Sequence, residues 1–180
     1  MNRPSSGNAT PGDLEVERTF LLRAMPTMPP GSVEVLRIEQ GYLPAGGEFE
    51  GRFRRTVDES GREAFVHTVK RGLGLVREEV EREIDAATFF REWPRTVGRR
   101  LRKTRHRVRG ASGLTWEIDE FHELPPVEGR ALVMAEVEIP HGVDPAAVTP
   151  PEWLRDLIVR EVTDEPRFRN FALAAASATI

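Results

Sequence analysis

The feature that most constrains the fold is an alternation of apolar and polar residues that returns repeatedly along the chain. In the stretch LEVERTFLL, residues 14–22, Glu15, Glu17 and Thr19 share one side, and most residues on the other side are apolar. This period of two is typical of β-strands, in which successive side chains point to opposite faces of a sheet. About eight such runs are separated by turn-forming residues. They cover residues 14–23, 33–43, 48–57, 62–70, 76–84, 99–108, 114–121 and 131–140.

Short turns between these runs favour antiparallel neighbours joined as hairpins. Turn-forming residues fill positions 44–47, 58–61 and 110–113. Helices are the minority, and we expect them at residues 85–93, 151–159 and 167–178. The first of these begins at Asp85, a residue suited to an N-cap, and ends before Pro94. The sequence therefore predicts a mainly β (α+β) fold.

Length and composition narrow the organisation and the chemistry. With 180 residues, 39% of them hydrophobic, the chain suits a single domain, which we place at residues 13–180. Residues 1–12 are rich in Pro, Ser, Gly and Asn, so we expect a disordered tail. The lack of cysteine excludes a disulfide framework, a thiolate metal site and a cysteine nucleophile. Without a signal-peptide core or a long apolar stretch, we expect a cytoplasmic protein that has no membrane partner.

The charged residues are segregated by sign among the predicted strands. Charged residues make up 31% of the chain, but the net charge is only −3. A face exposed only to water usually mixes the two signs, and like charges set close together repel one another. The acidic faces carry Glu15 and Glu17; Glu79, Glu81 and Glu83; Glu117 and Asp119; and Glu136 and Glu138. The basic faces carry Arg52 and Arg54; Lys70; and Lys103, Arg105 and Arg107.

This segregation points to a site for a metal-bound phosphate anion. Carboxylates that face one space suit a hard cation, whereas guanidinium and ammonium groups suit phosphate. An eight-stranded antiparallel closed barrel brings such faces together most simply, with the charges lining a wet tunnel and the apolar faces covered outside by helices. An ordinary sheet with one solvated face explains any single strand better, but it explains the whole set less well.

An ordered series of motifs also makes the sequence resemble the CYTH proteins, or triphosphate tunnel metalloenzymes. The mark of this family is an E-x-E-x-K strand near the N-terminus, and the matching stretch here runs from Glu15 to Phe20. The resemblance continues through QGYL (40–43), EGRFR (50–54), TVK (68–70), GRRLRKTR (98–105), WEID (116–119), AEVE (135–138) and EVT (161–163). It covers residues 14–173 in the expected order.

The resemblance implies an eight-stranded barrel and metal-assisted hydrolysis of triphosphates by water, with Mg²⁺ or Mn²⁺ as the cofactor. Glu15, Glu17, Glu136 and Glu138 match the catalytic, metal-binding glutamates, and Asp119 is expected as a further metal ligand, with Glu81 and Glu117 near the ions. Arg52, Arg54, Lys70, Lys103, Arg105 and Arg167 match positions that bind the substrate's phosphates. Two positions depart from the family pattern. Thr19 replaces a lysine, and Phe168 replaces a tyrosine often found there.

Several functions are compatible with this resemblance. The same phosphate and metal groups would serve inorganic tripolyphosphate, an adenylyl cyclase substrate or thiamine triphosphate. The two departures also allow a polyphosphate- or nucleotide-binding protein without catalysis. Eight of the sixteen residues from Arg95 to Gly110 are basic, but no aromatic residues are interleaved, so we do not expect a nucleic-acid partner. A homodimer is compatible with the sequence, which does not reveal the oligomeric state.

Overall fold

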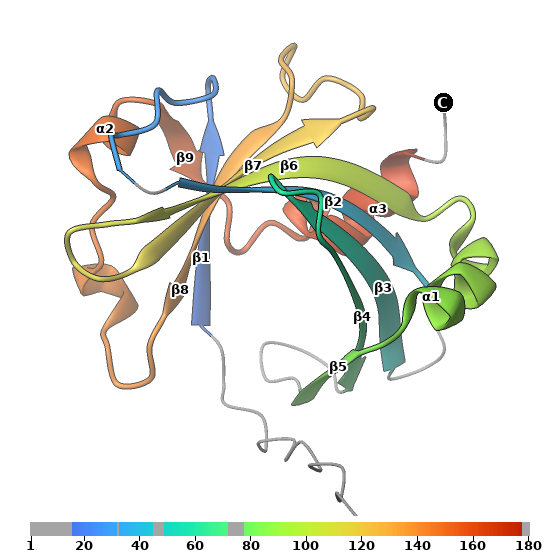
Figure 1. The fold of residues 1–180 in the computed structure, drawn as a ribbon. Helices are drawn as coiled ribbons and strands as arrows, with labels where there is room; N and C mark the ends of the chain where they lie inside the picture. Colours follow the sequence, from blue (N-terminus) through green and yellow to red (C-terminus); the bar gives the residue numbers. More distant parts are fainter. Residues whose placement is uncertain (1–15, 32, 45–48, 72–77, 178–180) are drawn as a thin grey trace, which may run out of the picture.

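All nine strands of the protein belong to one antiparallel sheet in the part of the chain that the computed structural model describes, residues 16–31, 33–44, 49–71 and 78–177. The strand order is β5-β4-β3-β2-β6-β7-β8-β1-β9, and the sheet is strongly curved (Figure 1). The strands are β1 (Val16–Leu22), β2 (Val33–Tyr42), β3 (Phe49–Asp58), β4 (Glu63–Arg71), β5 (Glu78–Glu83), β6 (Arg100–Arg109), β7 (Thr115–His122), β8 (Val133–Ile139) and β9 (Ile158–Glu161).

The helices are short and lie between or after the strands. They are α1 (Ala86–Glu92), α2 (Glu152–Arg155) and α3 (Asn170–Ala176), with 3₁₀ turns η1 (Trp93–Thr96), η2 (Pro145–Ala147) and η3 (Pro166–Phe168). The Asp85 side chain accepts a hydrogen bond from the Thr88 backbone N–H, so the predicted N-cap of α1 is confirmed. No helix in the described ranges is long and apolar enough to cross a membrane.

The mainly β architecture is confirmed, and eight strands lie where the alternation predicts them, with ends shifted by one or two residues wherever those ends are described. The ninth strand, β9, was not predicted. Helix 151–159 is wrong beyond Arg155, because the chain extends after α2 and pairs with β1. Helix 167–178 begins late, since Pro166 starts a 3₁₀ turn first. The predicted tail at residues 1–12 lies outside the described residues.

The backbone pairing leaves the sheet open, in contrast to the closed eight-stranded barrel expected from sequence. In the described ranges β5 pairs only with β4, and β9 pairs only with β1, so these strands are the two edges. The curvature nevertheless gives the sheet an inner and an outer face (Figure 1). A tunnel-like arrangement therefore depends on this curvature, because hydrogen bonds between the edge strands do not close it.

The outer face holds two of the three apolar clusters. Phe20, Trp116 and Ile118 belong to the larger cluster, which includes Leu154 of α2. In the smaller one, Phe53 of β3 and Phe65 of β4 pack with Phe89, Trp93 and other residues of the α1 region. Large aromatic side chains supply much of the buried area that holds these short helices on the sheet. The prediction that short helices cover the apolar faces from outside is confirmed for α1 and α2, whereas α3 packs against the inner face.

The third apolar cluster lies at one end of the inner face. Leu21, Leu101 and Met134 pack there against Leu173 of α3 and Phe168 of η3. The C-terminal segment thus covers this end of the face. The charged residues of the same strands occupy the rest of the face.

Candidate functional site

Strand register brings the segregated charges onto the inner face, because residues that pair across neighbouring strands share a face. Arg105 of β6 pairs with Leu36 of β2 and with Asp119 of β7, and Glu117 of β7 pairs with Glu136 of β8. Arg54 of β3 lies opposite Gln40 of β2. The inner-face positions that carry charge are Glu17, Glu34, Glu50, Arg52, Arg54, Asp58, Lys70, Glu79, Glu81, Glu83, Lys103, Arg105, Arg107, Arg109, Glu117, Asp119, Glu136, Glu138 and Arg160.

At the centre of this face, Asp119 holds two cations. Its Oδ2 accepts a hydrogen bond from Lys103 Nζ at 2.6 Å and another from Arg105 Nη2 at 2.7 Å. Its Oδ1 accepts from Arg105 Nε at 2.7 Å. Burial alone would raise the pKa of Asp119, but the charges of Lys103 and Arg105 lower it to about 2. Both carboxylate oxygens are therefore engaged by cations, which leaves Asp119 as an anchor for Lys103 and Arg105.

Arg105 connects this anchor to two glutamates on neighbouring strands. Its Nη2 donates to Glu136 Oε2 at 2.8 Å, and its Nη1 donates to Glu117 Oε2. Burial alone would lower the pKa of Arg105, but Asp119, Glu136 and Glu117 hold it well above its usual value. A planar guanidinium with five N–H donors suits this role, because it can contact several carboxylates at once and still carries a positive charge.

A second basic cluster lies on β3. Glu81 of β5 accepts from Arg54 Nη2 at 3.2 Å and from Thr68 Oγ1 at 3.2 Å, and it lies 3.6 Å from Arg52 Nη2. Burial, followed by the charge of Arg52, lowers the pKa of Arg54. The charges of Arg105 and Glu117 act on Arg54 as well. The basic clusters on β3 and β6 are thus close enough to act on the same anion.

On β1 and β8 the inner face is acidic, and two of its glutamates have no basic partner among the described residues. Glu17 pairs with Glu138 in the strand register, and Thr19 pairs with Glu136. Glu17 and Glu138 make no ion pair with any described residue, and Thr19 Oγ1 donates to Glu17 Oε1 at 3.1 Å. Burial, followed by the charge of Glu17, raises the pKa of Glu136 to about 7. Like charges directly opposite one another are destabilising unless a cation lies between them.

The donor chemistry of this acidic region fits a hard divalent cation. Carboxylate oxygens from adjacent strands are the ligands that Mg²⁺ and Ca²⁺ take in proteins, and a cation would relieve the repulsion at Glu136. In the described ranges, no group of three or more His, Asp or Glu side chains is arranged to hold an ion. Glu15, an expected ligand, lies outside those ranges. Glu17, Glu136 and Glu138 are the described carboxylates that suit the role.

The other expected site residues are placed unequally. Lys70 of β4 pairs in register with Glu50 and Glu79, which puts it on the inner face, but its side chain is not described. Arg167 lies elsewhere: it is 64% exposed, and its guanidinium contacts Glu165 and stacks on the ring of Phe168. The structure therefore brings together Arg52, Arg54, Lys103 and Arg105 but leaves Arg167 outside this cluster.

The two departures from the family pattern lie in contrasting surroundings. Thr19 is buried on the inner face beside the acidic residues, so a lysine there would place a cation among them. Arg18 points outward, where it pairs with Glu161 at 2.6 Å and covers Phe20, and it does not replace that lysine. Phe168 is buried in the apolar cluster beneath α3.

Sequence reasoning missed several polar residues that support the site. Thr68 donates to Glu81, and Asn170 of α3 accepts from Lys103 Nζ at 3.4 Å. Glu34 pairs with Arg107 at 2.8 Å. Alternation indicates the inner position of Thr68. The face of β2 that carries Glu34 also carries Leu36 and Ile38, so Glu34 did not stand out, and Asn170 follows no strand pattern.

Fold and site together define a curved β-sheet protein whose inner face sets cationic side chains against carboxylates. The chain is 36% identical, over 162 residues, to an inorganic triphosphatase of Nitrosomonas europaea, and the match covers 89% of this chain and 96% of that protein. The chain belongs to the inorganic triphosphatase family. It matches no protein-family model.

Solved structures agree with this assignment. A crystal structure of an inorganic triphosphatase is 32% identical to the chain, with a TM-score of 0.59, and the match covers 89% of this chain and 94% of that one. A protein of Pyrococcus horikoshii, 19% identical with a TM-score of 0.53 and 88% of this chain covered, shares the fold.

Proposed function

We propose that this protein hydrolyses a triphosphate with the help of a divalent metal ion, and that inorganic tripolyphosphate is its preferred substrate. The observation that carries the proposal is the inner face itself, where the cations of β3 and β6 face the same space as the carboxylates of β1, β7 and β8. The inorganic triphosphatase relative, aligned over nearly its full length, supports the same activity. A triphosphate ester is the alternative substrate.

The basic residues of β3 and β6 would hold the phosphate chain. Arg105 and Lys103 are fixed by Asp119, so they need little rearrangement to bind an anion. Arg52 and Arg54 approach the same space from β3, and Lys70 has an inner-face register position. Preorganised cations of this kind supply most of the catalysis in phosphoryl transfer, since the protein does little covalent chemistry. Arg167 is left out of this set because it contacts Glu165 instead.

The carboxylates of β1 and β8 would hold the metal. Glu17, Glu136 and Glu138 are the described residues suited to it, together with Glu15. When bound, Mg²⁺ or Mn²⁺ neutralises phosphate oxygens and makes the attacking water more acidic. Asp119 was expected as a ligand, but its two oxygens accept from Lys103 and Arg105, so we assign it a positioning role.

The reaction consumes one water molecule. Its oxygen forms a bond to a terminal phosphorus, the neighbouring P–O–P anhydride bond breaks, and pyrophosphate leaves as orthophosphate forms. Arg105 and Lys103 would stabilise the negative charge that develops on the phosphate oxygens. The resemblance to the CYTH proteins, the cytoplasmic location and a homodimeric state are further proposals that accompany this function.

The direct test is incubation of the pure protein with tripolyphosphate, ATP or thiamine triphosphate, in the presence of Mg²⁺, Mn²⁺ or a chelator. Release of orthophosphate and pyrophosphate from tripolyphosphate, dependent on the metal, supports the proposal. Cyclic nucleotide formation from ATP would indicate an adenylyl cyclase, and preferential cleavage of thiamine triphosphate would indicate the ester substrate. Tight binding of all three without turnover would indicate a non-catalytic binder.

A further inference from the structure

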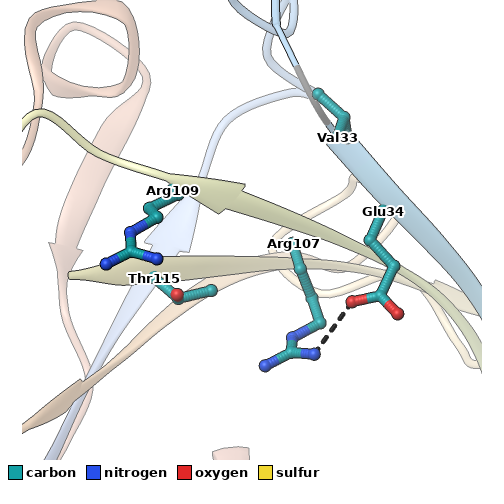
Figure 2. A pocket seen from close by; sticks show the side chains of 5 residues that line it. All are labelled: Val33, Glu34, Arg107, Arg109 and Thr115. Atoms are coloured by element: carbon teal, nitrogen blue, oxygen red, sulfur yellow. Dashed lines mark hydrogen bonds and ion pairs between the residues drawn. The ribbon is translucent and has the colours of Figure 1, made fainter. Parts of the chain in front are cut away.

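A small pocket lies at one end of the charged inner face, beyond the residues assigned to the triphosphate. It is lined by Val33, Glu34, Arg107, Arg109 and Thr115 and has a volume of about 290 Å³ (Figure 2). Arg107 and Arg109 follow Lys103 and Arg105 at alternate positions of β6, so all four share one face. This row spans roughly 20 Å from Lys103 to Arg109, further than three linked phosphate groups reach.

From Arg105 towards the pocket, each arginine of this row contacts fewer carboxylates among the described residues. Arg105 contacts three carboxylates. Arg107 contacts two carboxylates. Its Nη1 lies 2.8 Å from Glu34 Oε2, and its Nε lies 3.2 Å from Glu117 Oε1. The Arg109 side chain makes no hydrogen bond or ion pair with any described residue, and it is exposed. An anion that approaches from this end therefore meets first the guanidinium of Arg109, which has no carboxylate partner among the described residues, and then that of Arg107, which has two.

The pocket chemistry suits phosphate groups better than an organic substituent. Two guanidinium groups and the Thr115 hydroxyl are hydrogen-bond donors, and no aromatic side chain lines the pocket to stack on a base or a ring. Arginine forks match phosphate geometry with paired hydrogen bonds. Glu34 is the exception, because its carboxylate occupies Arg107 and would repel an incoming phosphate (Figure 2).

We propose that this pocket is a subsite for the outer phosphates of linear polyphosphate chains longer than three units, with Glu34 as a displaceable partner that holds Arg107 until such a chain arrives. The subsite rests on the proposed function, since it extends the same phosphate row outward. It makes Arg109 and Glu34 determinants of chain-length preference. Tripolyphosphate itself does not reach them.

The test is calorimetric titration of the protein with tripolyphosphate and with a linear polyphosphate of about ten units, with metal chelated so that no turnover occurs. We expect the longer chain to bind the unmodified protein more tightly. Arg109→Gln should weaken binding of the longer chain by about fivefold at low salt and leave tripolyphosphate binding unchanged. Glu34→Gln should strengthen binding of the longer chain only.

Arg37→Gln is the matched control, because Arg37 is an exposed arginine on the outer face of β2. Its substitution should change neither affinity. Equal affinity of the unmodified protein for both chains, or an equal effect of Arg109→Gln on both, overturns the subsite. Turnover measured with metal restored keeps the two proposals apart: its absence removes the hydrolase, whereas the Arg109 result tests the subsite alone.

Discussion

The inner face has a basic region and an acidic region whose charges are balanced in different ways. In the basic region Lys103 and Arg105 are tied to Asp119, which is fully buried and accepts from both. In the acidic region Glu17 and Glu138 lie opposite each other without an ion pair to any described residue. A cation bound between these two carboxylates would relieve their repulsion, whereas Lys103 and Arg105 are already paired with a carboxylate of the chain itself.

This difference suggests a division of labour. Lys103 and Arg105 are held in place before any ligand binds, because both are paired with Asp119 and so lose little freedom when they contact phosphate. Under the proposed function, the acidic region is completed only when a metal ion binds. Substitutions in the basic region should therefore act first on stability, and those in the acidic region should act first on metal-dependent turnover.

The largest effect should come from Asp119→Ala. It leaves Lys103 and Arg105 buried without their shared counter-charge, which typically costs about 3–5 kcal/mol of stability. Chemical denaturation measures this loss. Added tripolyphosphate should restore part of it, because the anion replaces the missing carboxylate.

Asp119→Asn keeps the shape of the side chain without its charge, and it should lose less stability than the alanine variant. A free energy of unfolding that hardly changes in Asp119→Ala would contradict the anchoring role and break the contrast between the two regions.

Glu136→Gln should have the next largest effect, on turnover. The substitution removes a buried carboxylate from the acidic region, and loss of one preorganised electrostatic group commonly slows an enzyme by about 10²–10³-fold. Steady-state release of phosphate from tripolyphosphate measures it. Glu120→Gln, on the outer face of β7, is the control and should keep full activity. An unchanged rate in Glu136→Gln would disprove the metal assignment.

Much of the fold could be predicted from sequence, because alternation reports directly which residues share a face of a strand. It located eight strands and most of the charged inner positions, although it passed over Glu34, Glu50 and Arg109. It missed β9, since four residues are too few to show a period and they follow a helical turn. The open sheet could not be predicted either, because closure depends on contacts between distant edges.

The partners within the site were beyond the reach of sequence reasoning. Alternation put Asp119 and Lys103 on one face, but only the side-chain hydrogen bonds show that cations occupy both oxygens of Asp119. Arg167 lies on a 3₁₀ turn, where no rule of alternation gives the direction of its side chain. Family position suggested a phosphate-binding role for Arg167, and the structure places its guanidinium against Glu165 and the ring of Phe168.

Thr19→Lys tests the contrast from the other direction, by supplying a cation to the acidic region. Thr19 lies opposite Glu136, so a lysine ammonium would reach these carboxylates and the bound phosphates. A charge-assisted contact to phosphate is worth about 1.5–3 kcal/mol, and we expect about a tenfold gain in kcat/KM for tripolyphosphate. Thr19→Gln is the control for side-chain length. A weaker response to Mg²⁺ without faster turnover would instead mean that the lysine competes with the metal.

The smallest effect should be a pH dependence of stability in the metal-free protein. Burial and the charge of Glu17 raise the pKa of Glu136 from its usual 4.5 to about 7, so the folded state holds this proton more tightly than the unfolded state. Stability from this group is complete below pH 4.5 and is lost as the pH rises through 7. We expect the melting temperature to fall as the pH rises between these values.

The pKa of His67 is lowered by burial, which acts in the opposite direction over the same range, so the comparison must be made against Glu136→Gln. That variant should lose the decline and keep the contribution of His67. Saturating Mg²⁺ should also remove the decline in the unmodified protein, since a bound cation favours the ionised carboxylate. If the decline persists unchanged in Mg²⁺, the acidic region does not take up a cation. The contrast between a basic region balanced by Asp119 and an acidic region balanced by a bound metal ion would then be wrong.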